Sequence, residues 1–124
     1  MKKNQNTQVP ANNALVVVIA ITVADGSLFD PTGAIGVYIV AKTSTSTGTD
    51  ILITKSTDPA AGGKAAFVQN PTDLTWTLQA TLDPSDTKDL TPLNYYHEAT
   101  IIEAGAKPET IMTGQFTVIP TVYR

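Results

Sequence analysis

The chain has 124 residues, of which 42% are hydrophobic and 15% are charged, and this length fits one domain with a single buried core. Cysteine is absent, which excludes disulfide bonds, thiolate catalysis and cysteine-based metal sites. The formal charge of −3 and the pI near 4.8 argue against a nucleic-acid partner, because neutralising phosphates requires clustered Lys and Arg.

The first segment, residues 1–13 (MKKNQNTQVPANN), is polar and has no hydrophobic period. Such a segment buries too little apolar surface to order by itself. We therefore expect an extended amino-terminal arm that lies along a neighbouring molecule, with Val9 and Pro10 at the interface. Residues 14–124 are expected to form a single β-sandwich domain.

The segment 14–24 (ALVVVIAITVA) is apolar at both parities, which predicts a strand that is covered on both faces. Val16, Val18 and Ala20 form one of these faces, and we expect them to contact another chain. A basic start followed by an apolar run is also typical of a signal peptide. The run is shorter than the roughly 20 residues that span a bilayer, and we interpret it as a strand with no membrane role.

The residues 30–33 (DPTG) predict a type I turn, because Pro presets the backbone angle and Gly closes the turn. Further strands are expected over 35–42, 51–56 and 65–69. In the first of them, Ile35, Val37 and Ile39 are expected to face the core.

The segment 74–82 alternates strictly between apolar residues and Thr or Gln, which is the period of a half-buried strand. Leu74 and Trp76 belong to its apolar face, so we expect both in the core. A short helical turn is predicted after it, and the last two long strands are expected over 95–102 and 110–119. Phe116 and Val118 should point inward.

His97 is the sole histidine of the chain. A catalytic triad would require an activated Ser beside it, and a metal site would require further ligands. Strand parity places His97 with Tyr95, Ala99 and Ile101, whereas Glu98 points to the opposite side. We expect His97 to be a sheet-surface or interface residue.

Asp83, Asp86 and Asp89 recur at every third position, and a calcium site is one interpretation. The spacing is not that of an EF-hand, and Pro84 suits the first position of a capped helical turn. The residues 62–64 (GGK) lack the spacing of a phosphate-binding loop. We therefore predict no catalytic residue, no cofactor-binding residue and no metal ligand, and expect a protein that is not an enzyme.

The predicted elements amount to about seven short strands. Twenty Thr residues, together with eight Gly and eight Pro, suit a β-rich chain with frequent turns. An all-β, immunoglobulin-like sandwich with an extended amino-terminal arm is the fold that we expect.

Four blocks carry a resemblance to a known family: VADGSLFDPTGAIGVYIVAK from Val23, TLDPSDTKDL from Thr81, LNYYHEATII from Leu93 and TGQFTVIP from Thr113. Their order resembles the immunoglobulin-like module of tailed-phage virion proteins, best known from the amino-terminal domain of baseplate upper proteins. The resemblance extends from Val23 to Pro120. It implies a non-enzymatic role in the virion.

Baseplate adaptors carry a long carboxy-terminal extension, whereas the expected domains here are one module and an arm. We therefore expect a capsid decoration or cement protein on the capsid surface, acting as a homo-oligomer such as a trimer and bound to the major capsid protein or other virion proteins. A tail, baseplate or fibre-attachment protein is one alternative. A cell-surface or carbohydrate-binding β-sandwich is another, and it would require an exposed aromatic platform.

Overall fold

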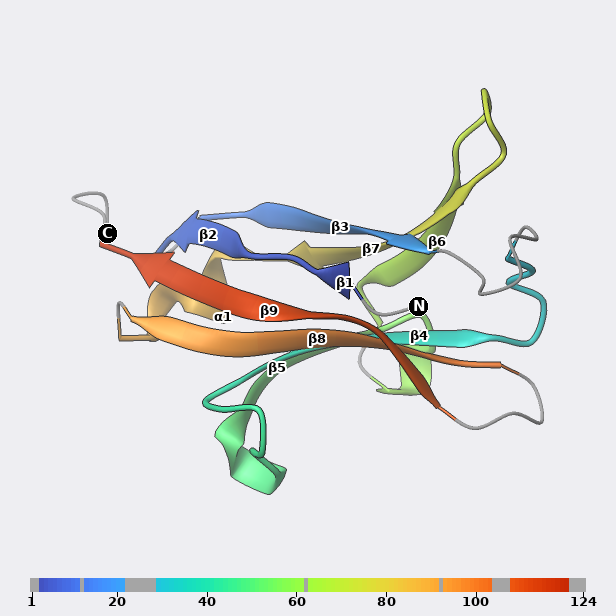
Figure 1. Ribbon diagram of the computed structural model, residues 1–124. Helices are drawn as coiled ribbons and strands as arrows, with labels where there is room; N and C mark the ends of the chain where they lie inside the picture. The colour runs from blue at the N-terminus through green and yellow to red at the C-terminus, as the bar shows by residue number, and fades with distance from the viewer. Residues whose placement is uncertain are drawn as a thin grey trace.

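The computed structural model describes residues 3–11, 13–21, 29–61, 63–91, 93–103 and 108–120, and these form two β-sheets packed face to face (Figure 1). The chain is thus an all-β sandwich. In the described residues, the elements in chain order are β1 (Lys3–Asn4), β2 (Thr7–Pro10), β3 (Leu15–Ile21), β4 (Ile35–Ala41), η1 (Gly48–Asp50), β5 (Ile51–Ser56), η2 (Pro59–Ala61), β6 (Ala65–Gln69), β7 (Trp76–Leu82), α1 (Pro84–Lys88), β8 (Asn94–Ile102) and β9 (Glu109–Ile119).

The larger sheet has the order β1-β9-β8-β4-β5, with β2 also paired to β9, and the smaller sheet has the order β3-β7-β6. β1 and β2 run parallel to β9, and the other strand pairs are antiparallel. In Figure 1, β3, β7 and β6 form the upper layer and β9, β8, β4 and β5 the lower layer. All seven predicted strands are confirmed as β3 to β9, although residues 22–24 of the first prediction lie outside the described residues.

The amino-terminal segment differs from the expectation, because residues 3–10 pair with β9 of their own chain. The backbone amide of Gln5 donates to the carbonyl of Thr113 at 2.9 Å, and the amide of Ala11 donates to Ile119 at 3.0 Å. β9 would otherwise present a row of open backbone groups. A polar segment can occupy such an edge, because ladder hydrogen bonds depend on the backbone and not on apolar side chains.

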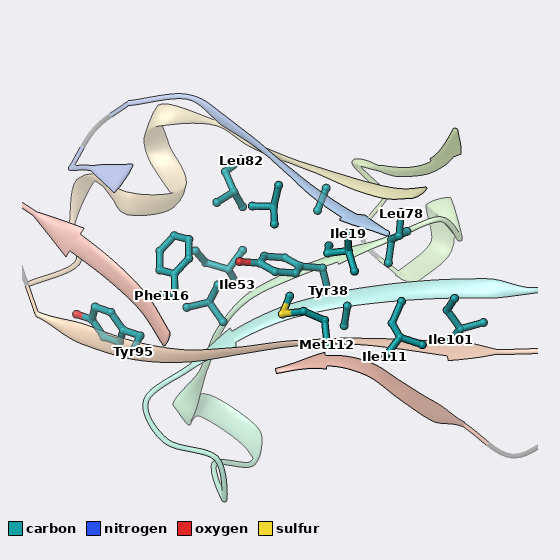
Figure 2. Packing of buried hydrophobic residues seen from close by; sticks show 14 of the residues in the cluster. Ile19, Tyr38, Ile53, Leu78, Leu82, Tyr95, Ile101, Ile111, Met112 and Phe116 are labelled. Atoms are coloured by element: carbon teal, nitrogen blue, oxygen red, sulfur yellow. The ribbon is translucent and has the colours of Figure 1, made fainter. Parts of the chain in front are cut away.

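The core lies between the two sheets (Figure 2). The alternating pattern of 74–82 is confirmed from Trp76 onward, because Leu78, Ala80 and Leu82 are fully buried and lie beside Ile19 and its inward neighbours on β3, in the same sheet. Phe116 and Val118 also point inward as predicted. The core is closed by these apolar side chains, which supply most of the favourable free energy of folding.

The predicted inward face of β4 is wrong. Tyr38 and Val40 are fully buried, whereas Ile35, Val37 and Ile39 lie on the outer side of the sheet and are only partly buried. Both parities of this strand are apolar, so hydrophobicity does not select the face. The selection comes from Tyr38, whose hydroxyl finds a buried hydrogen-bond partner in His97.

Leu74 is also not in the core. It is 48% exposed and has a φ of 63°, in the turn that precedes β7. Its amide donates to the carbonyl of Asn70 at 2.9 Å, while the Asn70 amide donates to Thr75 at 2.8 Å. These bonds fix a tight hairpin connection, which requires the left-handed backbone at Leu74 and turns its side chain outward.

The predicted helical turn is confirmed as α1, with Pro84 at its first position. The Asp86 carboxylate accepts the backbone amide of Asp83 at 2.7 Å, which satisfies one donor at the helix start. The same carboxylate pairs with Lys55 of β5 at 3.0 Å. α1 is thereby fastened to the edge of the larger sheet. Within the described residues, no helix has the length and apolar character needed to cross a membrane.

Candidate functional site

The outward face of the smaller sheet is the most distinctive surface of the chain, and we name it the valine face. The register of β3, β7 and β6 brings together alternate residues of the three strands. The outward residues are Val16, Val18 and Ala20 of β3, Thr77, Gln79 and Thr81 of β7, and Ala66 and Val68 of β6.

The valine face is uncharged, with apolar residues on its two outer strands, β3 and β6, and polar residues on the central strand, β7. Val16, Val18 and Val68 are 49%, 46% and 40% exposed. None of the eight residues that define the face carries a charge. Isolated exposed apolar residues are ordinary, but an uncharged surface on which several exposed valines gather is typical of an interaction surface.

Two polar side chains of the valine face are already hydrogen-bonded within it. Gln79 Nε2 donates to the hydroxyl of Thr77 at 3.3 Å, and that hydroxyl donates to the carbonyl of Val68 at 3.2 Å. Covering these groups with a partner therefore costs less than covering unpaired ones. This lowers the desolvation cost of an interface at the face.

The area of the valine face is small compared with that of a stable protein–protein interface. Three strands of up to seven residues, at about 4.8 Å between strands and about 3.3 Å per residue, cover roughly 330 Å². A stable complex buries about 800 Å² on each partner. The face can therefore contribute to an assembly with several contacts, and it is too small to hold a partner by itself.

The sequence predicted Val9, Pro10, Val16, Val18 and Ala20 as interface residues. The last three share the valine face and are exposed. Pro10 is exposed as well, but it lies on β2 at the edge of the larger sheet. Val9 is only 1% exposed and packs in the core of its own chain, so its side chain is already covered without a neighbour.

A second candidate site is buried, and it is centred on His97. The prediction of a sheet-surface or interface residue is wrong, because His97 is fully buried. Its Nε2 lies 2.6 Å from the backbone carbonyl of Gln5, and its Nδ1 lies 2.8 Å from the hydroxyl of Tyr38. A carbonyl can only accept, so Nε2 carries the proton and Nδ1 accepts from the Tyr38 hydroxyl.

Burial changes the acid–base behaviour of both groups. It lowers the pKa of His97, and the hydrogen bond to the Gln5 backbone only partly opposes this shift. Burial also raises the pKa of Tyr38 above its ordinary value. Both rings are therefore held neutral, in the protonation states that their mutual hydrogen bond requires.

Gln5 connects three strands to the amino-terminal segment. Its amide donates to Thr113 of β9, its carbonyl accepts from His97 of β8, and its side-chain Nε2 donates to the carbonyl of Val18 on β3 at 3.2 Å. The last bond reaches the edge of the valine face. Gln5 thus ties the amino-terminal strand to both sheets.

The approach of Gln5 depends on Gly114, which lies opposite His97 on β9. A Cβ atom at Gly114 would overlap the Gln5 carbonyl oxygen. Glycine within a strand often marks such a close backbone approach, so Gly114 was the sequence signal for this contact. Nothing in the sequence marked Gln5 itself, because its role lies mostly in its backbone.

Two of the three aspartates that suggested a calcium site have other partners. The Asp86 carboxylate accepts the Asp83 amide and pairs with Lys55, while the Asp83 carboxylate lies 4.0 Å from Lys64. Among the residues that the structure describes, no group of three or more His, Asp or Glu side chains is placed to hold a metal ion. The residues 62–64 include Gly62, which lies outside the described residues.

Comparison of the chain with models of protein families and with curated proteins finds no match.

Proposed function

We propose that this chain is an immunoglobulin-like module and a structural protein of a tailed-phage virion, most specifically a capsid decoration or cement protein. The strand order supports the fold. Read across the smaller sheet, β3, β7 and β6 take the places of strands B, E and D of an immunoglobulin domain. Read across the larger sheet, β9, β8, β4 and β5 take the places of strands G, F, C and C′. β1 and β2 join strand G instead of the B-E-D sheet.

Tyr95 gives independent support for the fold. It is the second residue of β8, and its hydroxyl donates to the carbonyl of Thr91 at 2.8 Å. Immunoglobulin-like domains have such a tyrosine corner at the start of strand F, where the hydroxyl bonds to the backbone a few residues upstream.

The same assignment of strands accounts for the central position of His97 and Tyr38. In antibody domains the residue two positions after the corner tyrosine is a cysteine, and a buried tryptophan on strand C packs against its disulfide. His97 and Tyr38 occupy the corresponding strands, and their rings meet edge to face at 5.6 Å between centroids. A hydrogen-bonded pair would then replace the disulfide and the tryptophan in the centre of the sandwich.

The observation that carries the proposed role is the uncharged valine face. A decoration protein works by covering boundaries between capsid subunits, and whatever binds only the assembled state stabilises it. An uncharged, valine-bearing face of roughly 330 Å² suits one of several contacts in such an assembly. The resemblance of the turn and core motifs to phage virion modules supports the same role.

The proposal can be tested with capsids that lack this protein. The wild-type chain and the double variant Val16→Lys/Val18→Lys are mixed with full heads and, separately, with tails, and the bound fraction is measured after sedimentation. The double variant Thr54→Lys/Gln115→Lys, at two exposed positions of the larger sheet, is the matched control because it adds two charges outside the valine face. We expect the wild type and the control to sediment with heads and the double variant to stay in solution.

Three results would point elsewhere. Binding to tails alone would favour the tail, baseplate or fibre-attachment role. Equal binding of all three chains to heads would refute the valine face as the contact. Binding to neither particle would favour a cell-surface or carbohydrate-binding protein, and a glycan array would then test for a carbohydrate ligand.

A further inference from the structure

His97 and the amino-terminal strand are joined in an unusual way. The imidazole is fully buried, yet its Nε2 bonds to the backbone of the strand at the edge of the sheet. The contact is made across Gly114, where the absence of a side chain leaves room for the Gln5 carbonyl. Gln5 itself lies between β1 and β2, where the pairing with β9 is interrupted.

From this geometry we propose that His97 is a proton-sensitive latch for the amino-terminal strand. The buried, neutral ring belongs to the state in which residues 3–10 lie on β9. A proton on His97 favours a state in which this strand has left the sheet and the ring is hydrated. The rest of the sandwich stays folded. The latch belongs to the isolated chain, so its test is independent of where the protein assembles.

The surroundings of His97 favour the neutral ring. The titratable groups that face inward near it are Tyr38 of β4, Tyr95 on β8 itself and Lys55 of β5, which is paired with Asp86 of α1. Glu98 points to the opposite side of the sheet. The inward residues of β2, β3, β7 and β9 are apolar apart from Thr7, or lack a side chain at Gly114. Among the described residues, a charge on the ring therefore meets no unpaired carboxylate, and burial opposes it.

Opening the strand removes this penalty. Water replaces the Gln5 carbonyl, which accepts from Nε2 and by itself favours the charged ring. The gain on opening is therefore the relief of burial, which is the larger of these two effects on the pKa of His97. The strand is also terminal, pairs on one side only and places Asn4, Asn6, Gln8 and Pro10 in solvent, while its core contact is made by Val9. Local opening of such elements costs less free energy than global unfolding.

Linkage fixes the size of the effect. Burial lowers the pKa of His97 in the closed state, and exposure of the ring on opening moves its pKa back toward the ordinary histidine value of about 6.5. Between these two values the open state binds one proton more than the closed state. The ratio of open to closed molecules should therefore rise by about tenfold for each pH unit below about 6.5.

Amide hydrogen exchange followed by NMR tests the latch, with each rate divided by its intrinsic value at the same pH. The Gln5 and Ala11 amides report on the strand, because both donate to β9. The Val118 amide is the control, because it donates to Leu93 on the other side of β9 at 3.0 Å. We expect protection of Gln5 and Ala11 to fall by about tenfold per pH unit below about 6.5 while that of Val118 stays constant.

Two outcomes with the wild-type chain would overturn the proposal. Protection of Gln5 and Ala11 that stays constant down to pH 4.5 would show that the strand is not linked to a proton. An equal fall at Val118 would show that acid unfolds the whole domain. The ring protons of His97 are recorded in the same samples, and the loss of strand protection must accompany their titration.

Two variants separate the latch from a purely structural role. His97→Gln stays uncharged, so its strand protection should not change between pH 7.5 and 5; a response equal to that of the wild type would refute the latch. Gly114→Ala should remove the protection of Gln5 and Ala11 at pH 7.5 and leave Val118 protected. Retained protection in Gly114→Ala would refute the close approach on which the latch depends.

Discussion

The ion pair between Lys55 and Asp86 gives a prediction that depends on which partner is removed. Lys55 is buried and points inward from β5, and its Nζ lies 3.0 Å from the carboxylate of Asp86. The Asp86 side chain is 20% exposed and also accepts the Asp83 amide. The lysine thus depends on the aspartate more than the aspartate depends on the lysine.

Asp86→Asn keeps an oxygen that can accept the Asp83 amide, but it leaves the Lys55 ammonium buried without a counter-charge. Removing one partner of a buried pair costs about 3–5 kcal/mol, and the partial exposure of Asp86 puts the expected loss near the lower value, at about 3 kcal/mol. Lys55→Met keeps the aliphatic volume and leaves a carboxylate at the start of α1, where the helix favours negative charge. We expect it to cost about 1 kcal/mol or less.

The assay is urea unfolding followed by the fluorescence of Trp76, the only tryptophan of the chain. With a slope of about 1.5 kcal/mol/M, Asp86→Asn should lower the midpoint by about 2 M and Lys55→Met by less than about 0.7 M. The double variant Lys55→Met/Asp86→Asn should be more stable than Asp86→Asn alone, because no buried charge remains. Equal and additive losses in the two single variants would refute this account of the pair.

Three further predictions concern stability and ionisation. Tyr95→Phe should lower the free energy of unfolding by about 1 kcal/mol, because the carbonyl of Thr91 loses its partner; an unchanged urea midpoint would count against the tyrosine corner. Phe116→Ala should cost about 3–5 kcal/mol, since its ring is fully buried in the core, and a smaller midpoint shift would mean that the sandwich collapses around the gap. Burial raises the pKa of Tyr38, so the folded state favours the neutral phenol, and this contribution to stability is present below about pH 10 and lost as the pH rises further. Absorbance at 295 nm and circular dichroism should show Tyr38 ionising only together with unfolding, and its ionisation in the folded chain would contradict the buried hydrogen bond.

The strands and the helical turn could be predicted because their signals are local. The alternation in 76–82 and the inward positions of Phe116 and Val118 follow from a period of two residues. The turn at α1 follows from Pro84 at its first position and acidic residues around it. Each of these patterns depends on neighbours within a few positions, and each is confirmed.

The failures concern contacts between residues far apart in the chain. Both parities of β4 are apolar, so its inward face was decided by a hydrogen bond from Tyr38 to His97, which is 59 residues away. The same bond, with that to Gln5 across 92 residues, placed the histidine in the core. The amino-terminal segment was expected to extend away because it is polar, but the open edge of β9 binds backbone irrespective of side chains.

The valine face and the amino-terminal strand meet at Gln5, and this has a consequence for association. β3 is an edge strand, and an edge strand with exposed valines is a ready template for pairing with another chain. The Gln5 side chain donates a hydrogen bond to the carbonyl of Val18 on that edge. While the amino-terminal strand is in place, a partner can therefore cover the valine face but cannot extend its sheet through Val18 without displacing Gln5. Release of the strand would free this carbonyl and the edge of β9 together, so the strand that completes the larger sheet also protects the smaller one from unspecific pairing.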